Sequence, residues 1–351
     1  MFNLDSLVRE NIKKLQPYSS ARSEYSGKAS VYLDANENSF GSPLIKWYNR
    51  YPDPLQWELK KKIGVIKSVE PEQMLLGNGS DECIDLLIRC FCEPVSNNII
   101  ICPPTYGMYE VYGHINNVGV KQVPLLAHFQ LHLEAIEAAI DEGTRIIFLC
   151  SPNNPTGNSL LRQDIEAILN NFDGIVVVDE AYINYSRQYS LVADLKDYPN
   201  LVVMQTFSKA WGLAALRLGL TFASPAIINY LNKIKPPYNI NGASQDLALS
   251  ALDNLADVNS MILETISERE KLVTSLQILD VVIIIYPSDA NFILVKVHGA
   301  NNLYQHLKDR GIIVRNRSNV ILCDDCLRIT IGTADQNAQL TEAIKTYKYN
   351  Q

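Results

Sequence analysis

The sequence has no excess of positive charge: 31 Lys and Arg stand against 38 Asp and Glu, for a formal net charge of -7 over 351 residues. Because nucleic-acid surfaces depend on clustered basic residues, this balance disfavours a nucleic-acid partner. No apolar run approaches the roughly 20 residues of a membrane span, and Met1 to Ser6 lack the basic start and apolar stretch of a signal peptide. We therefore expect a cytoplasmic protein without a membrane partner.

The sequence also lacks a complete metal-binding or disulfide pattern. Its seven cysteines are scattered and odd in number, which fits a reducing compartment better than a disulfide framework. Cys323 and Cys326 have the spacing of half a zinc or redox site, but no second pair follows them. His128 and His132 lie four residues apart without an acidic third ligand of metalloenzyme spacing. We expect no metal site.

Two nucleotide-binding motifs are missing as well. No G-x-x-x-x-G-K-[ST] accompanies the acidic pair at 179–180, and Gly77-Asn-Gly79 lacks the third glycine of a dinucleotide-binding fingerprint. No helix-turn-helix extension is recognisable at the N-terminus, which argues against a DNA-binding regulator. The composition, 47% hydrophobic and 20% charged, is that of an ordinary globular protein.

Apolar runs alternate with helical patterns through the middle of the chain. This alternation predicts an α/β fold with a mostly parallel sheet covered on both faces. Open sheets of this kind bind ligands at the carboxyl ends of their strands, so the loops that follow the first four runs should border one crevice. The runs expected as strands are 98–102, 145–150, 174–179, 201–205 and 218–222.

The flanking segments give more local predictions. Asp53 and Pro54 are typical of the N-cap and first position of a helix, and residues 31–33 read as a short strand. Gly311 suits the end of a helix near 300–310. Two further helices are expected in this part of the chain, at 258–278 and 335–348. Strands are expected at 281–286, 291–295, 312–314 and 327–331. We expect an arm over 1–30 that packs on the small domain and substrate site, a large domain over 31–245 and a smaller α+β domain over 246–351.

Lys209 is the candidate nucleophile. It follows the apolar run 201–205, where loss of water favours the neutral amine that condenses with a carbonyl. The planar guanidinium of Arg217 adds several N–H donors for an oxyanion, and Thr206 and Ser208 add hydroxyl donors. Seen alone, a Ser-Lys pair followed by an arginine is more typical of a solvated turn, so the interpretation depends on the other strand ends.

Those strand ends suit one aromatic aldehyde that carries a phosphate, a ring nitrogen and a phenolic oxygen, namely pyridoxal 5′-phosphate. Asp179 would keep the ring nitrogen protonated, so that the ring withdraws electrons. Asn154 and Tyr182 would hydrogen-bond the phenolic oxygen, and Tyr106 would lie on the ring, although alone it could equally be a core aromatic. The phosphate would be held by the amides of Ser80 and Asp81 at a helix start, with Thr206, Ser208 and Arg217.

The same motifs resemble those of the fold-type-I pyridoxal-phosphate aminotransferases, over about residues 17 to 333. That family has a large three-layer domain with a mostly parallel sheet and a smaller α+β domain. Within it, Leu33-Asp-Ala-Asn-Glu-Asn38 and Pro17-Tyr-Ser-Ser-Ala-Arg22 resemble the histidinol-phosphate aminotransferases. The motifs shared more widely are Gly77-Asn-Gly-Ser-Asp-Glu82, Ser151-Pro-Asn-Asn-Pro-Thr-Gly157, Asp179-Glu-Ala-Tyr182 and Ser208-Lys209 with Arg217.

The resemblance implies roles for four further residues. Tyr51 would reach the cofactor phosphate of a neighbouring subunit, which makes the active form a homodimer. Arg328 would grip the carboxylate of glutamate or 2-oxoglutarate and, with Arg315 and Tyr18, the phosphate of the other substrate.

The implied reaction is ping-pong transamination between L-histidinol phosphate and 2-oxoglutarate in histidine biosynthesis, giving imidazole acetol phosphate and L-glutamate. Lys209 would move the proton, assisted by Asp179 and Tyr182. An aromatic or general amino-acid aminotransferase and a threonine-phosphate decarboxylase use the same scaffold. Arg315 together with Arg328 favours a phosphorylated substrate but does not separate histidinol phosphate from threonine phosphate, so the alternatives stay open on sequence alone.

Overall fold

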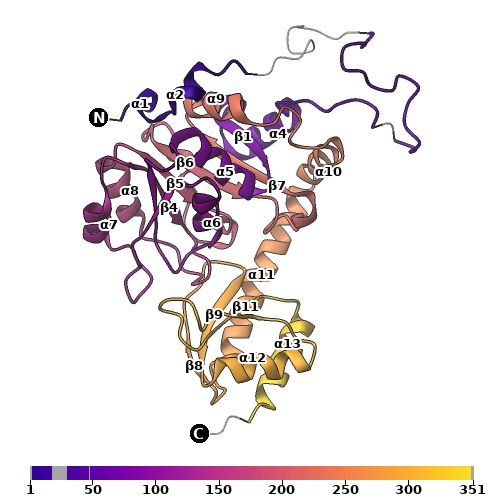
Figure 1. Ribbon diagram of the computed structural model, residues 1–351. Helices are drawn as coiled ribbons and strands as arrows, with labels where there is room; N and C mark the ends of the chain where they lie inside the picture. Colours follow the sequence, from indigo (N-terminus) through magenta and orange to yellow (C-terminus); the bar gives the residue numbers. More distant parts are fainter. Residues whose placement is uncertain (1, 18–29, 47, 349–351) are drawn as a thin grey trace.

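The computed structural model describes residues 2–17, 30–46 and 48–348 (Figure 1). Its described part contains a seven-stranded sheet in the order β1-β7-β6-β5-β4-β2-β3, and a four-stranded sheet described below. None of the helices in these ranges is long and apolar enough to cross a membrane. The strands of the large sheet are β1 (Met74–Asn78), β2 (Asn98–Ile101), β3 (Gly119–Gln122), β4 (Thr144–Cys150), β5 (Ile175–Asp179), β6 (Leu201–Thr206) and β7 (Leu218–Ala223).

The large sheet is mostly parallel, as predicted. Neighbouring strands from β3 to β6 pair in parallel, whereas β7 is antiparallel to both β6 and β1. The five predicted strands all form. The sequence did not predict β1, which contains Gly77, or the edge strand β3, whose polar residues break the apolar pattern. Because β7 is reversed, the residue that precedes it, Arg217, reaches the edge where the parallel strands end.

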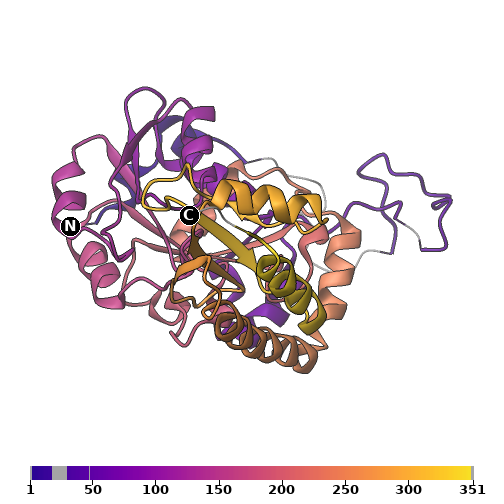
Figure 2. The same ribbon diagram turned by 90° about the horizontal axis from the view of Figure 1, so that it is seen from below.

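Helices cover both faces of this sheet, so the large body has three layers (Figures 1 and 2). Alternate residues of β5 enter two separate core clusters: Val176 and Val178 pack toward α4 and α8, and Ile175 and Val177 toward α5 and α9. This alternation explains why the strand is apolar throughout. The covering helices are α4 (Trp57–Lys67), α5 (Ser80–Phe91), α6 (Met108–Ile115), α7 (Leu133–Ala139), α8 (Arg162–Asn171), α9 (Pro225–Ile234) and α10 (Gly242–Leu252).

The helix expected at Asp53 begins later, at Trp57, so this expected boundary is wrong. The Asp53 carboxylate accepts hydrogen bonds from the amides of Leu55 (2.9 Å) and Trp57 (2.6 Å) and therefore still caps the helix start. Gln56 between them is left-handed, with φ 52°, which prevents α4 from starting earlier.

The smaller body surrounds the antiparallel sheet β10-β11-β9-β8 and is joined to the larger one by the long helix α11 (Figure 1). The expected strand at 312–314 is wrong: the amide of Ile312 donates to Leu307 O (2.9 Å) and closes the preceding helix, with Gly311 at φ 74° as predicted. The elements are α11 (Leu255–Leu276), β8 (Val282–Ile285), β9 (Phe292–Val297), α12 (Ala300–Asp309), β10 (Arg315–Asn316), β11 (Cys326–Thr330) and α13 (Ala334–Lys345).

The first described segment, with α1 (Leu4–Leu7) and α2 (Glu10–Lys14), packs on the large body. Its apolar residues Leu7 and Ile12 join the core cluster of α5 and α9, and the Tyr230 hydroxyl donates to Asp5 (2.8 Å). We expected the 1–30 arm to lie on the small domain, so for residues 2–17 that expectation is wrong. The expected strand at 31–33 does not form either. Residues 18–29, which include Tyr18, lie outside the described residues.

Candidate active site

A cavity of about 780 Å³ lies at the carboxyl ends of the parallel strands. Its walls come from the loops after β1, β2, β4, β5 and β6, from the residue before β7 and from the small sheet. The structure thus brings together twelve residues singled out from the sequence: Ser80, Asp81, Tyr106, Asn154, Asp179, Tyr182, Thr206, Ser208, Lys209, Arg217, Arg315 and Arg328.

Lys209 lies three residues after the end of β6 and is accessible from the cavity. Its Nζ is 5.6 Å from the centroid of the Tyr182 ring. The surrounding protein removes water from the amine and thereby lowers its pKa; the charge of Arg328 acts in the same direction, while Asp179 opposes it. A lysine in this environment is more often neutral, and so more nucleophilic, than one in water.

Asp179 ends β5 and is only 4% exposed. Its carboxylate accepts a hydrogen bond from the Tyr109 hydroxyl (2.6 Å) and another from the amide of Ala181 (3.0 Å). Burial raises the pKa of Asp179, and these hydrogen bonds act against that rise. No cationic side chain of the described residues forms an ion pair with it, so the site holds a carboxylate that lacks a close positive partner.

An anion site lies where β1 leads into α5. The chain turns through Gly79 at φ 77°, and a Cβ there would come within 2.6 Å of Arg217 Nη2. The guanidinium of Arg217 therefore passes directly over the glycine, beside the N-terminus of α5. Its Nη2 is 3.5 Å from the Asp81 carboxylate. Free amides at a helix start together with a guanidinium are suited to bind a phosphate.

The opposite side of the cavity is formed where the small sheet meets the loops after β4 and β5. The Arg328 guanidinium donates to Asn154 Oδ1 and lies 5.3 Å from the centroid of the Phe292 ring. That ring packs edge-on against Tyr182. Burial lowers the pKa of Arg328, and the charge of Arg315 lowers it further. Arg328 of the small sheet thus places a desolvated guanidinium against the loop that follows β4 of the large sheet.

Tyr51 does not line this cavity. It stacks on Tyr238, with ring centroids 4.5 Å apart, beside a second hollow of about 250 Å³. It is 51% exposed, so its side chain is available to another molecule.

Sequence reasoning missed two residues of the site, Tyr109 and Arg317. Tyr109 is fully buried, holds Asp179 and packs against Tyr106 with ring centroids 5.6 Å apart. Its spacing of three residues from Tyr106, one helical turn, is the signal that could have found it. Arg317 lines the cavity, and its spacing of two from Arg315 would have placed both on one side of an extended chain.

Comparisons with known proteins agree with this geometry. The family described as aminotransferase class I and II matches residues 24–344. The proteins of Cytophaga hutchinsonii and Bacteroides thetaiotaomicron named histidinol-phosphate aminotransferase are each 52% identical to the chain, over 99% of its length and 99% and 100% of theirs.

Solved structures show the same fold. The histidinol-phosphate aminotransferase of Clostridium acetobutylicum superposes with a TM-score of 0.78 at 24% identity, over 85% of this chain and 90% of that one. The enzyme of Sinorhizobium meliloti, in complex with pyridoxal-5′-phosphate, superposes with a TM-score of 0.79 at 23% identity, over 89% and 88%. The fold-type-I architecture predicted from the sequence is therefore confirmed. By its full-length identity to these relatives, the chain belongs to the class I and II aminotransferases and, among them, to the histidinol-phosphate aminotransferase family.

Proposed function

We propose that this protein transfers the amino group of L-histidinol phosphate to 2-oxoglutarate, giving imidazole acetol phosphate and L-glutamate. The observation that carries the proposal is one cavity lined by a lysine whose pKa is lowered, by the start of α5 with Arg217, and by Arg328 and Arg315 of the small sheet. The relatives at 52% identity, named for this substrate, support it over the full length.

The cofactor is pyridoxal 5′-phosphate, and the residues of the cavity fit it. Asp179 is a buried carboxylate without a cationic partner, which a protonated ring nitrogen would supply. The start of α5 and Arg217 offer donors for its phosphate, and the hydroxyls of Thr206 and Ser208 line the same wall. When bound, the cofactor supplies a reactive aldehyde and a ring that stabilises negative charge at the substrate Cα.

The chain's own residues then bind, orient and move protons. The lowered pKa of Lys209 leaves its Nζ partly neutral. This amine can remove the proton from the Cα of the amino donor in one half-reaction and deliver a proton to the Cα of the product amino acid in the other. The Tyr182 ring lies beside this amine and packs edge-on against Phe292, and Asn154 accepts a hydrogen bond from Arg328, so contacts within the chain restrain both side chains. Tyr106, whose hydroxyl donates to Asp81 (3.1 Å), is the residue we propose to lie against the ring.

Two substrates share one oxyanion site in this proposal. Arg328 would bind the carboxylate of glutamate or 2-oxoglutarate in one half-reaction and the phosphate of histidinol phosphate in the other, with Arg315 beside it. Tyr18 stays a proposed contact, since it lies outside the described residues.

We also propose that the active form is a homodimer in which Tyr51 serves the cofactor phosphate of the neighbouring subunit. Residues 30–46 extend away from the body of the molecule (Figures 1 and 2), and they expose Phe40 at 97% and Ile45 at 106%. An apolar segment of this kind on a free surface is unfavourable and marks a protein interface. The division into a large domain over 31–245 and a small one over 246–351, and a cytoplasmic location, likewise remain proposals.

The deciding experiment compares amino donors on the purified holoenzyme with 2-oxoglutarate as acceptor. L-Histidinol phosphate should be used far better than L-phenylalanine, and threonine phosphate should release no carbon dioxide. Lys209→Ala should lose both activity and the visible absorbance of the covalently attached cofactor, whereas an exposed lysine such as Lys61 can be changed without loss. Preferred use of phenylalanine, or decarboxylation of threonine phosphate, would refute the assignment.

A further inference from the structure

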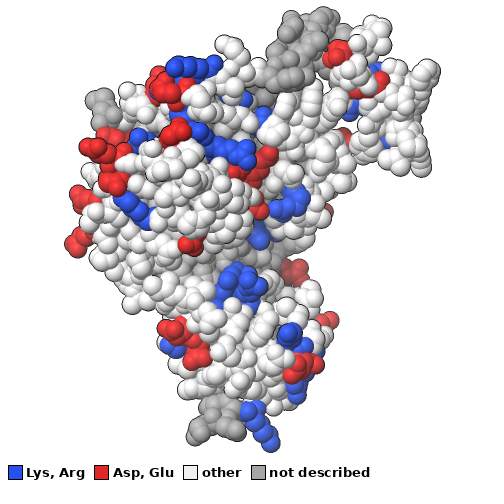
Figure 3. All heavy atoms as spheres, in the orientation of Figure 1, with Lys and Arg blue, Asp and Glu red and all other residues white. Residues whose placement is uncertain are grey.

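Three arginines meet at the small-sheet end of the cavity. Arg315 of β10 lies directly opposite Arg328 of β11 in the antiparallel register, and Arg317 follows two residues after Arg315. All three line the cavity that contains Lys209. In the space-filling view, Lys and Arg atoms gather in the hollow between the large and small bodies (Figure 3). Arg317 has no role in the function proposed above.

Arg317 has donors without acceptors. Its Nε is buried and forms no hydrogen bond among the described residues. Burial lowers the pKa of Arg317, and the charges of Arg328 and Arg315 lower it further. A buried donor without a partner costs free energy, so its retention here calls for an acceptor that the folded chain does not supply.

No described carboxylate neutralises this cluster. Arg328 donates one hydrogen bond to the neutral side chain of Asn154. Neither Arg315 nor Arg317 forms an ion pair with an acidic side chain of the described residues. Three guanidinium groups held together repel one another unless an anion binds between them. The uncompensated positive charge of the cluster therefore favours a ligand that carries more than one negative charge.

We propose that Arg317 is a third phosphate-binding residue, which makes the shared oxyanion site prefer phosphate monoesters over carboxylates. The inference rests on the proposed function, since it assigns a substrate-discriminating residue to the same cavity. A phosphate monoester carries a charge of about -1.5 to -2 at pH 7 and three acceptor oxygens. A carboxylate has two oxygens, which Arg328 and Arg315 can satisfy. Only the phosphate leaves an oxygen for Arg317.

The test is Arg317→Gln in the holoenzyme, with each half-reaction followed separately by the absorbance of the bound cofactor. We expect kcat/KM for L-histidinol phosphate to fall about 10- to 100-fold, the value of a hydrogen bond to a charged group. For L-glutamate it should change less than about threefold. Arg317→Lys should recover part of the loss, because it restores the charge but not the planar fork. Arg310→Gln, an exposed arginine of the same small body, is the matched control.

Equal losses on both substrates, accompanied by a lower melting temperature, would overturn the proposal by showing that Arg317 has a structural role. An unchanged kcat/KM for histidinol phosphate would overturn it as well. Inhibition of the glutamate half-reaction by inorganic phosphate separates this inference from the proposed function. If the wild type rejects histidinol phosphate but Arg317→Gln still weakens phosphate inhibition about tenfold, the substrate assignment fails and the role of Arg317 stands. Unaltered phosphate inhibition overturns the role of Arg317 alone.

Discussion

Tyr109 determines how readily Asp179 carries a negative charge. Its hydroxyl donates to the Asp179 carboxylate at 2.6 Å in a fully buried position, and this hydrogen bond lowers a pKa that burial alone would raise. The ring of Tyr109 is fixed by stacking on Phe148, with centroids 4.8 Å apart. A core residue thus holds the carboxylate that we propose as the partner of the cofactor's ring nitrogen.

We predict that Tyr109→Phe shifts the acid limb of the kcat/KM profile to higher pH by about one unit. The lost hydrogen bond, about 1.5–3 kcal/mol for a charged acceptor, raises the pKa of Asp179, so the carboxylate becomes protonated at a higher pH than in the wild type. The measurement is kcat/KM for glutamate between pH 5 and 9. Tyr112→Phe, on the same helix, is the control, and a shift of equal size in that variant would contradict the specific role of Tyr109.

The strand β7 and the start of α5 lie close together at the proposed phosphate site. A Cβ on Gly219 of β7 would lie 2.5 Å from Gly79 C and from Ser80 N, which are backbone atoms and cannot give way. The glycine therefore lets the start of the helix lie against the sheet, where its amides face the cavity.

Gly219→Ala should accordingly weaken cofactor binding while leaving the chain folded. Displacement of the α5 start removes part of the donor set for the phosphate, and we expect roughly a tenfold loss of affinity for pyridoxal 5′-phosphate. Titration of the apoenzyme with the cofactor, followed by tyrosine and tryptophan fluorescence, measures it. Gly242→Ala is the matched control, because its new Cβ would meet side-chain atoms only at 3.8 Å or beyond. The same loss in that control would show that the effect does not arise at α5.

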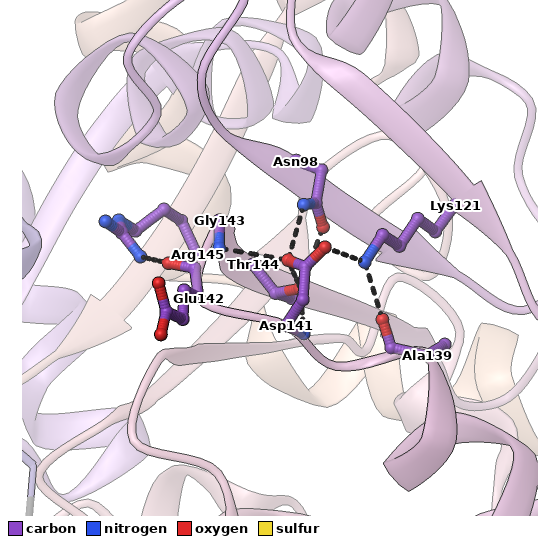
Figure 4. Close-up of polar contacts among 8 residues, drawn as sticks. All are labelled: Asn98, Lys121, Ala139, Asp141, Glu142, Gly143, Thr144 and Arg145. Carbon is purple, nitrogen blue, oxygen red and sulfur yellow. Dashed lines mark hydrogen bonds and ion pairs between the residues drawn. The ribbon is translucent and has the colours of Figure 1, made fainter.

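The amino ends of the parallel strands are held by a separate polar network (Figure 4). Asp141 accepts hydrogen bonds from Asn98 (2.9 Å), Gly143 N (3.0 Å) and Lys121 (2.6 Å), and thereby links β2, β3 and β4. These contacts lower the pKa of Asp141, and the hydrogen bond from Lys121 has the largest effect. The network lies at the edge of the sheet away from the cavity, so its effect should be on stability rather than on activity.

We predict that Asp141→Asn lowers the melting temperature at pH 7 without changing kcat. A carboxyl whose pKa is lower in the folded state contributes stability above its unfolded pKa, and this contribution disappears as the pH falls through the folded value. The difference in melting temperature between Asp141→Asn and the wild type should therefore be largest above pH 5 and decrease on acidification below about pH 4. Thermal unfolding at several pH values tests this. Glu134→Gln, exposed at the start of α7, is the control, and a difference that persists at low pH would contradict the role of the carboxylate.

In the homodimer that we propose, a second subunit would complete the site. The segment 30–46 exposes apolar side chains, and Tyr51 faces a hollow outside the cavity of its own chain. We predict that Ile45→Asp converts the dimer into monomers, because it places a charge where apolar surface would be buried. Light scattering measures the mass, and Ile278→Asp in the small body serves as control. A dimer that persists would place the interface elsewhere.

Subunit mixing tests whether Tyr51 acts across the interface. In a hybrid of Lys209→Ala with Tyr51→Phe subunits, one site would combine both changes and the other would be intact. The hybrid should therefore be more active than either parent at limiting cofactor. Activity no higher than the mean of the parents would mean that Tyr51 serves its own subunit.

Local composition predicts the strands of the parallel core and the residues at their ends. The apolar runs are continuous because both faces of the sheet are buried, and such runs are readable from local composition. Asp179 ends one of these runs, and Asn154 and Lys209 each lie four residues after another, so parallel pairing alone predicts that they converge. The start of α4, by contrast, was wrong by three residues, because the backbone turn at Gln56 left no compositional signal.

Contacts between surfaces that are distant in the sequence depend on the completed fold. The first segment lies on α5 and α9 because its apolar face completes their core, a contact that local pattern does not specify. Tyr109 reaches Asp179 across 70 residues of sequence, and Arg317 lines the cavity because the small sheet packs against loops of the large body. Local periodicity reports burial of one face of an element, whereas the choice of partner depends on the shape and charge of the completed fold.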